Sequence, residues 1–113
     1  MARIEGYGFG RVLVDGREET ADVIVLPGRV VRNWRRRDGH GLVLEDLDAV
    51  LDDLPGRLVI GTGANGRLRP DPVTLELLRQ RGVEVEALPT DEAVRRFREL
   101  DPATTAAALH LTC

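Results

Sequence analysis

The amino-acid sequence predicts one α/β domain in which helices pack on a mixed β-sheet. Residues 12–34 contain short β-branched and apolar runs separated by turns, whereas residues 42–112 alternate between strand-like and helix-like segments. A chain that begins with neighbouring strands and continues with alternating strands and helices is typical of a sheet with antiparallel and parallel pairs. The length of 113 residues suits a single domain, which we assign to residues 1–113.

The first third of the chain is predicted to form strands and to contain a β-hairpin. Residues 12–14 are followed by an Asp-Gly dipeptide, which favours the positive φ angles of hairpin turns. Residues 21–26 are nearly all apolar, as in a strand that is buried on both faces. After a Pro-Gly break, residues 29–34 form a further strand-like run, and a polar loop follows over residues 35–41.

Three helices are predicted in the rest of the chain. Apolar residues recur at helical spacing over residues 47–54, with aspartates between them. A second helix begins at Asp71, an N-cap followed directly by proline, and stops at Gly82. A third is predicted to be capped by Thr90 and to end before Asp101. The strands expected between and after them cover residues 42–44, 58–60, 83–88 and 106–112.

Composition excludes several classes of protein. The net charge of −3 argues against general binding to nucleic acid or to a membrane surface, and no apolar run is long enough to span a bilayer. All 16 basic residues are arginine, which excludes Schiff-base chemistry and a Walker-type phosphate loop. The single cysteine, Cys113, excludes an internal disulfide, and together with the absence of a visible signal peptide it predicts a cytoplasmic protein.

A glycine-rich loop is the first candidate site. Residues 61–66, GTGANG, follow a strand and fit G-x-G-x-x-G, with Glu84 and Glu86 at the distance of a ribose-binding acid. Pro70 and Pro72 delay the next helix, however, so its N-terminus cannot lie at the loop, and we expect no NAD or other cofactor. Two interpretations stay open, a tight turn at a strand end and a site for a small anionic ligand. The candidate residues here are Gly61, Thr62, Gly63 and Gly66.

An arginine-rich loop is the second candidate. Residues 34–40, WRRRDGH, form the only dense basic cluster of the chain, and arginine binds phosphate and carboxylate groups through two parallel hydrogen bonds. This loop is predicted to be a solvated surface, a partner-binding surface, or one side of an anion site shared with the glycine-rich loop. The candidate residues are Trp34, Arg35, Arg36 and His40, together with His110 near the end of the chain.

His110 and Cys113 have the spacing of two metal ligands, but a structural zinc site needs four, and we expect no metal. A strand over residues 106–112 would place the two side chains on opposite faces. The pair could also act as nucleophile and base, although no convincing catalytic set emerges from the spacing. We assign no catalytic residues, and we expect the protein not to be an enzyme.

Several motifs together resemble the Mth938-like domain family. They are residues 4–10, IEGYGFG, the Gly61-Thr62-Gly63 turn and the closing HLTC of residues 110–113, in the family's order and across nearly the whole chain. The resemblance implies a three-layer α/β fold around a mixed sheet, with about three helices. The family comprises uncharacterised bacterial and archaeal proteins, related to an adipogenesis-associated protein and to a mitochondrial complex I assembly factor. It supplies no catalytic residues.

The favoured function is therefore a non-catalytic binding or assembly module with a protein partner, acting as a monomer or a homodimer. The partner surface is predicted at residues 34–40, so replacing Arg35 and Arg36 with alanine should abolish binding and leave the melting temperature nearly unchanged. The alternative is a small-ligand or anion-binding protein, or an enzyme, that uses the loops at residues 61–66 and 35–40. This alternative requires the two loops to converge with His110.

Overall fold

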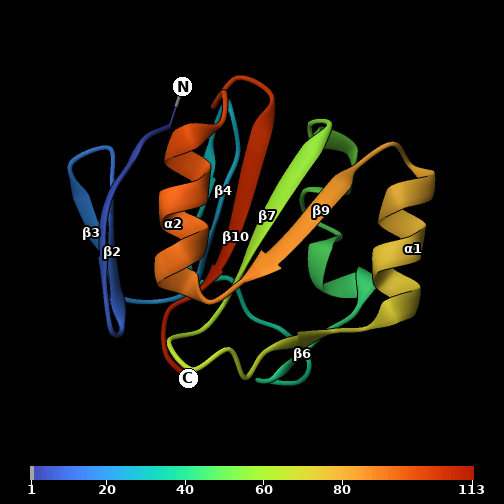
Figure 1. Ribbon diagram of the computed structural model, residues 1–113, viewed down its shortest axis with the longest axis horizontal. Coiled ribbons are helices and arrows are strands. Elements are labelled where there is room, and N and C mark those ends of the chain that lie inside the picture. Colours follow the sequence, from blue (N-terminus) through green and yellow to red (C-terminus); the bar gives the residue numbers. More distant parts are fainter. Residues whose placement is uncertain (1) are drawn as a thin grey trace.

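A mixed five-stranded sheet forms the centre of the protein in the computed structural model, which describes residues 2–113 (Figure 1). The central strand β10 (Thr105–His110) is antiparallel to β4 (Val23–Val25) and parallel to β7 (Arg57–Thr62), and β7 is parallel to β9 (Glu84–Leu88). Parallel and antiparallel pairs therefore meet at β10, as a mixed sheet requires. From edge to edge the strands are β5 (Val30–Val31), β4, β10, β7 and β9.

Two smaller sheets accompany the central one. The N-terminal sheet is antiparallel and contains the predicted hairpin, whose turn places Asp15 and Gly16 at positive φ. A short parallel pair joins the segment after the arginine-rich loop to the segment before the first α-helix. The strands are β1 (Ile4–Gly8), β2 (Arg11–Val14) and β3 (Arg17–Glu19) in the first, and β6 (Gly41–Leu42) and β8 (Arg69–Pro70) in the second.

The two faces of the central sheet are covered differently. One face packs on α2 (Thr90–Glu99) and the N-terminal sheet, while the other packs on α1 (Pro72–Gln80) and the segments around residues 42–54 (Figure 1). Side chains alternate between the faces along each strand, so that Val59 lies in one core and Leu58 and Ile60 lie in the other. Because a second sheet forms part of one cover, the arrangement matches the expected three layers only in part.

Two α-helices are present among the described residues, not three. The helix predicted over residues 47–54 consists of two short 3₁₀ turns, Leu44–Leu47 and Leu51–Asp53. The Asp46 carbonyl accepts a hydrogen bond of 2.8 Å from Trp34 Nε1, and the amide of Val50 bonds to Leu47, three residues back. The segment therefore follows the i→i+3 pattern of 3₁₀ turns, and the Asp46 carbonyl, which an α-helix would pair with the Val50 amide, binds the indole.

The other two predicted helices are confirmed, but the predicted N-cap of the second, Thr90, does not cap it. Asp71 caps α1 by accepting from the amide of Val73, and Gly82 has a positive φ just past its C-terminus. Helix α2 begins at Thr90, but this side chain does not cap it. No helix among residues 2–113 has the length and apolar character needed to cross a membrane.

Candidate functional site

Several of the predicted site residues lie at one end of the central sheet. Strands β7 and β10 are parallel, and Thr62 and His110 are paired at their carboxyl ends. The Thr90 hydroxyl, at the start of α2, donates to the His110 carbonyl at 2.6 Å and accepts from the Gly63 amide at 2.8 Å. Thr90 therefore bridges the ends of the two strands. In open α/β sheets, ligands bind outside the carboxyl ends of the strands, so a site is expected at this end of the central sheet.

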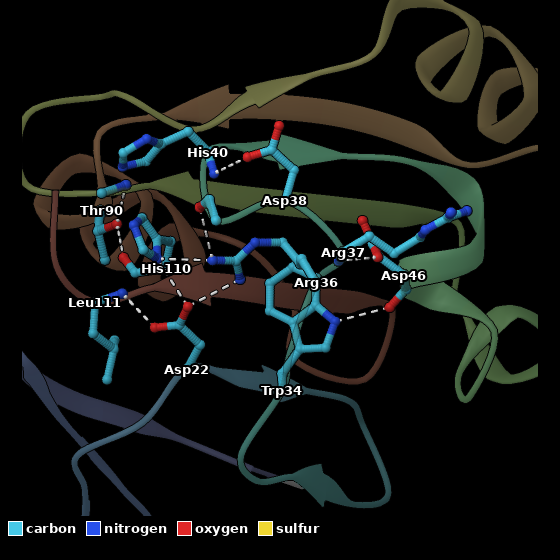
Figure 2. Close-up of polar contacts among 12 residues, drawn as sticks. Asp22, Trp34, Arg36, Arg37, Asp38, His40, Asp46, Thr90, His110 and Leu111 are labelled. Atoms are coloured by element: carbon cyan, nitrogen blue, oxygen red, sulfur yellow. Dashed lines mark hydrogen bonds and ion pairs between the residues drawn. The ribbon is translucent and has the colours of Figure 1, made fainter.

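Three ionisable side chains form a buried cluster at this end of the central sheet (Figure 2). Their side-chain exposures are 15% for Asp22, 4% for Arg36 and 9% for His110. Asp22 Oδ2 lies 2.8 Å from His110 Nδ1 and 2.9 Å from Arg36 Nη1. Asp22 Oδ1 accepts from the amide of Leu111 at 2.8 Å. The carboxylate is thus paired with a cation and holds both the ring of His110 and the chain that follows it.

Asp22 also decides which nitrogen of His110 carries the hydrogen. Nδ1 lies 2.8 Å from Asp22 Oδ2 and 3.0 Å from Arg36 Nη2, and one nitrogen cannot donate to the first and accept from the second at once. A carboxylate only accepts, whereas Nη2 has another acceptor in the Gly39 carbonyl, at 3.2 Å. We therefore place the hydrogen on Nδ1. The other ring nitrogen, Nε2, is buried and has no partner among the described residues.

The arginine-rich loop is fastened by alternate residues. Trp34 is buried, and the guanidinium carbon of Arg36 lies 4.7 Å from the centre of its ring, within cation–π range. Arg35 and Arg37 point outward and are exposed. The sequence predicted that Arg36 could be replaced with little effect on the melting temperature, but its side chain is buried against Asp22, His110 and Trp34, so we now expect its removal to lower stability.

The glycine-rich loop uses its amides within the chain. Besides the Gly63 amide, those of Ala64, Gly66 and Arg67 donate to the carbonyls of Thr112, Gly63 and Cys113, respectively. None of these four amides is available to cradle a phosphate, which disfavours the anion site expected here. Gly61 and Thr62 are buried as part of β7.

Gly63 marks the point where the glycine-rich loop meets His110. It has φ +105°, and a Cβ built on it would lie 2.3 Å from the carbonyl carbon of Cys113 and 2.9 Å from His110 Cδ2. Strand β10 ends at His110, so the chain turns there and folds back over Gly63. The expectation that a strand over residues 106–112 separates His110 and Cys113 on opposite faces is wrong for this reason.

Of the predicted residues, His110 contacts both loops, Arg36 and Gly63 reach it from opposite sides, and the exposed ring of His40 stands edge-on to it at 6.3 Å between centroids (Figure 2). Residues 2–113 contain no group of three or more side chains that could hold a metal ion. Sequence reasoning missed Asp22, whose only signal is a carboxylate directly before the buried run of β4.

Tyr7 connects the N-terminal sheet to this end of the central sheet, and it makes the stability of the fold depend on pH in the alkaline range. Its hydroxyl donates to the Leu111 carbonyl at 2.9 Å. Burial raises the pKa of Tyr7 above its ordinary value, and the charges of Asp91 and Asp22 raise it further. A phenol with a raised pKa in the folded state stabilises the fold fully below the unfolded pKa of about 10, and this contribution is lost as the pH rises through the folded-state value.

The melting temperature is therefore expected to fall from about pH 9 to about pH 11, and to fall less in Tyr7→Phe, which has no phenol to ionise. Thermal melts of both proteins across this range measure the difference. Removing the hydroxyl also removes one hydrogen bond, so the free energy of unfolding of the variant at neutral pH should be about 1 kcal/mol lower than that of the wild type. Equal alkaline losses in the two proteins would contradict this assignment.

Comparison with known proteins places this fold in a family. The family model described as "Protein of unknown function (DUF498/DUF598)" matches residues 4–110. A conserved hypothetical protein from Pyrococcus horikoshii OT3 is 32% identical, with a TM-score of 0.82 over 98% of this chain and 99% of that one. The protein MT938 is 30% identical, with a TM-score of 0.79 over 100% of both chains.

A third similar structure is that of a protein described as an outer membrane protein from Bartonella henselae. It is 26% identical, with a TM-score of 0.81 over 99% of this chain and 96% of that one. The similarity to MT938 confirms the resemblance that the motifs at residues 4–10, 61–63 and 110–113 predicted. The chain therefore belongs to the DUF498/DUF598 family and is Mth938-like.

Proposed function

We propose that the protein is a non-catalytic binding module and that its contact surface is the arginine-rich loop of residues 34–40. One observation carries this proposal. Trp34 and Arg36 turn inward and fasten the loop, whereas Arg35 and Arg37 are exposed and have no ion pair within residues 2–113. Binding costs less entropy when the contact loop is already held in one conformation.

The chemistry of the loop favours a partner that presents carboxylates. Guanidinium groups bind carboxylates through two parallel hydrogen bonds, and Arg is enriched at the centres of protein interfaces. An open hollow of about 550 Å³ beside Trp34 is lined by Arg35 and Arg37 on the loop and by Glu45 and Asp48 across from it. This hollow offers room for a side chain of the partner between groups of both charges. We place this contact in the cytoplasm, because the single cysteine suits a reducing compartment.

The proposal is tested by charge reversal with a matched control. The Arg35→Glu/Arg37→Glu variant should lose a partner that the immobilised wild-type chain captures from cell extract, and its melting temperature should stay within about 2 °C, since exposed substitutions cost little. The Arg79→Glu/Arg95→Glu variant has the same change of charge on exposed residues of α1 and α2 and should keep that partner.

Quantitative mass spectrometry of the three captures reads out the result. The partner should also leave the wild-type chain as salt rises to about 0.5 M, because exposed charge pairs are screened. If every captured protein is retained equally by both variants, this loop is not the contact surface. The alternative of an anion site at residues 61–66 is weakened, because the amides of Gly63, Ala64 and Gly66 are already bonded within the chain.

A further inference from the structure

A groove lies at the far end of α2, away from the buried cluster of Asp22, Arg36 and His110. The first described residues of the chain run beside the last turn of α2 (Figure 1), and the groove between them has a volume of about 450 Å³. Because α2 has ten residues and begins beside the cluster, about 15 Å of helix separates the two places. The residues that line the groove are Ala2, Arg3, Ile4, Glu5, Phe97, Arg98, Leu100 and Pro102.

The floor of this groove is apolar. Ala2, Ile4 and Phe97 are buried in the core that α2 shares with the N-terminal sheet, and Leu100 packs against the same core. The pairing of β1 with β2 shifts register between Ile4 and Gly6, and an irregularity of this kind bends a strand. An apolar floor with a few polar groups beside it is typical of small-molecule sites, whose volumes are about 300 to 1,000 Å³.

Two exposed arginines give the groove its charge. Arg98 Nε donates to the Ile4 carbonyl at 2.9 Å, which holds this guanidinium beside the groove. Neither Arg98 nor Arg3 has an ion pair within residues 2–113. Among the described residues of the lining, Glu5 is the one acid, and its carboxylate already accepts from the amide of Gly16. The carbonyl end of α2 adds a partial negative charge of about one half, which is smaller than the charge of either guanidinium.

We propose that this groove binds a small carboxylic acid with an apolar body, whose carbon chain lies on the floor and whose carboxylate contacts Arg98 and Arg3. Guanidinium groups bind carboxylates through two parallel hydrogen bonds, and both Nη groups of Arg98 are without a partner within residues 2–113. The volume suits a short or medium carbon chain, and burial of that chain contributes in proportion to its apolar area. This site is separate from the partner surface at residues 34–40 and does not depend on it.

The test titrates octanoate into the isotope-labelled protein and follows the chemical shifts of its backbone amides by NMR. The amides of Ile4, Phe97 and Leu100 should shift, with a dissociation constant of about 1 mM or lower for a ligand of about ten non-hydrogen atoms. Octanol has the same chain without the charge, and acetate has the carboxylate without the chain. At the same concentration of about 1 mM, each should shift these amides less than half as far, because each lacks one of the two contacts.

Arg98→Gln should weaken octanoate binding at least about fivefold, since a hydrogen bond to a charged group is lost. Arg95→Gln, at an exposed arginine of the same helix that does not line the groove, should leave the dissociation constant unchanged. If Arg98→Gln does not fold, Arg3→Gln takes its place. The proposal is overturned if octanoate shifts no amide of the groove at about 10 mM. Equal binding of octanol, equal binding by the folded Arg98→Gln protein, or shifts confined to residues 34–40 overturn it as well.

Discussion

Replacing Gly63 with alanine is expected to lower the free energy of unfolding by about 2 to 6 kcal/mol. Two costs add at this position. The backbone has φ +105°, which costs an L-residue about 1 to 3 kcal/mol, and the new methyl group would lie 2.3 Å from the carbonyl carbon of Cys113, where overpacking costs about as much again. The neighbouring atom is backbone and cannot rotate away.

Urea denaturation of both proteins measures this change, and Gly82→Ala is the matched control. Gly82 also has a positive φ, of +86°, but no atom lies within 4 Å of a Cβ placed there. Its loss should be about 1 kcal/mol, from backbone strain alone. Equal losses at the two positions would mean that the chain near Cys113 yields easily and that the close approach at Gly63 carries no energy.

The second large effect is expected at the buried ion pair. Arg36→Ala should cost about 3 to 5 kcal/mol, because it leaves the carboxylate of Asp22 buried and without its cation. It also removes the guanidinium from the face of Trp34. Arg79→Ala, at an exposed pair on α1, should change stability by no more than about 0.5 kcal/mol.

A double-mutant cycle separates the pair from its surroundings. Asp22→Ala combined with Arg36→Ala should cost about 1 to 3 kcal/mol less than the sum of the two single changes, since removing both charges leaves neither one stranded. Strict additivity would show that the contact between Arg36 and Asp22 contributes nothing to stability.

Local signals predicted the parts of this fold that depend on local chemistry. Asp71 caps α1 and Gly82 follows its end, since a cap and a positive φ act within a few residues. The segment expected to be a helix over residues 47–54 forms two 3₁₀ turns instead, and its Asp46 carbonyl accepts from a distant side chain, the indole of Trp34. Hydrophobic spacing cannot register such a contact, because 3₁₀ turns and an α-helix bury similar residues.

The sequence indicated some of the residues of the site but not their arrangement in space. Arg36 and His110 stood out by residue type, but Arg36 is indistinguishable in sequence from Arg35, and only the packing turns one inward and the other outward. The contacts that assemble the cluster join positions 74 and 88 residues apart. Convergence of the two loops on His110 therefore follows from the order of strands in the sheet.

The place of β10 in the middle of the sheet has a consequence for how the chain folds. Strand β10 comes after β4 and β7 in sequence, yet these two become neighbours only through it. During synthesis the earlier strands must wait, with their apolar edges uncovered, until residues 105–110 leave the ribosome. Pairings of such long sequence separation slow folding, and waiting strand edges attract other chains. A nascent chain halted before residue 105 should therefore depend on chaperones.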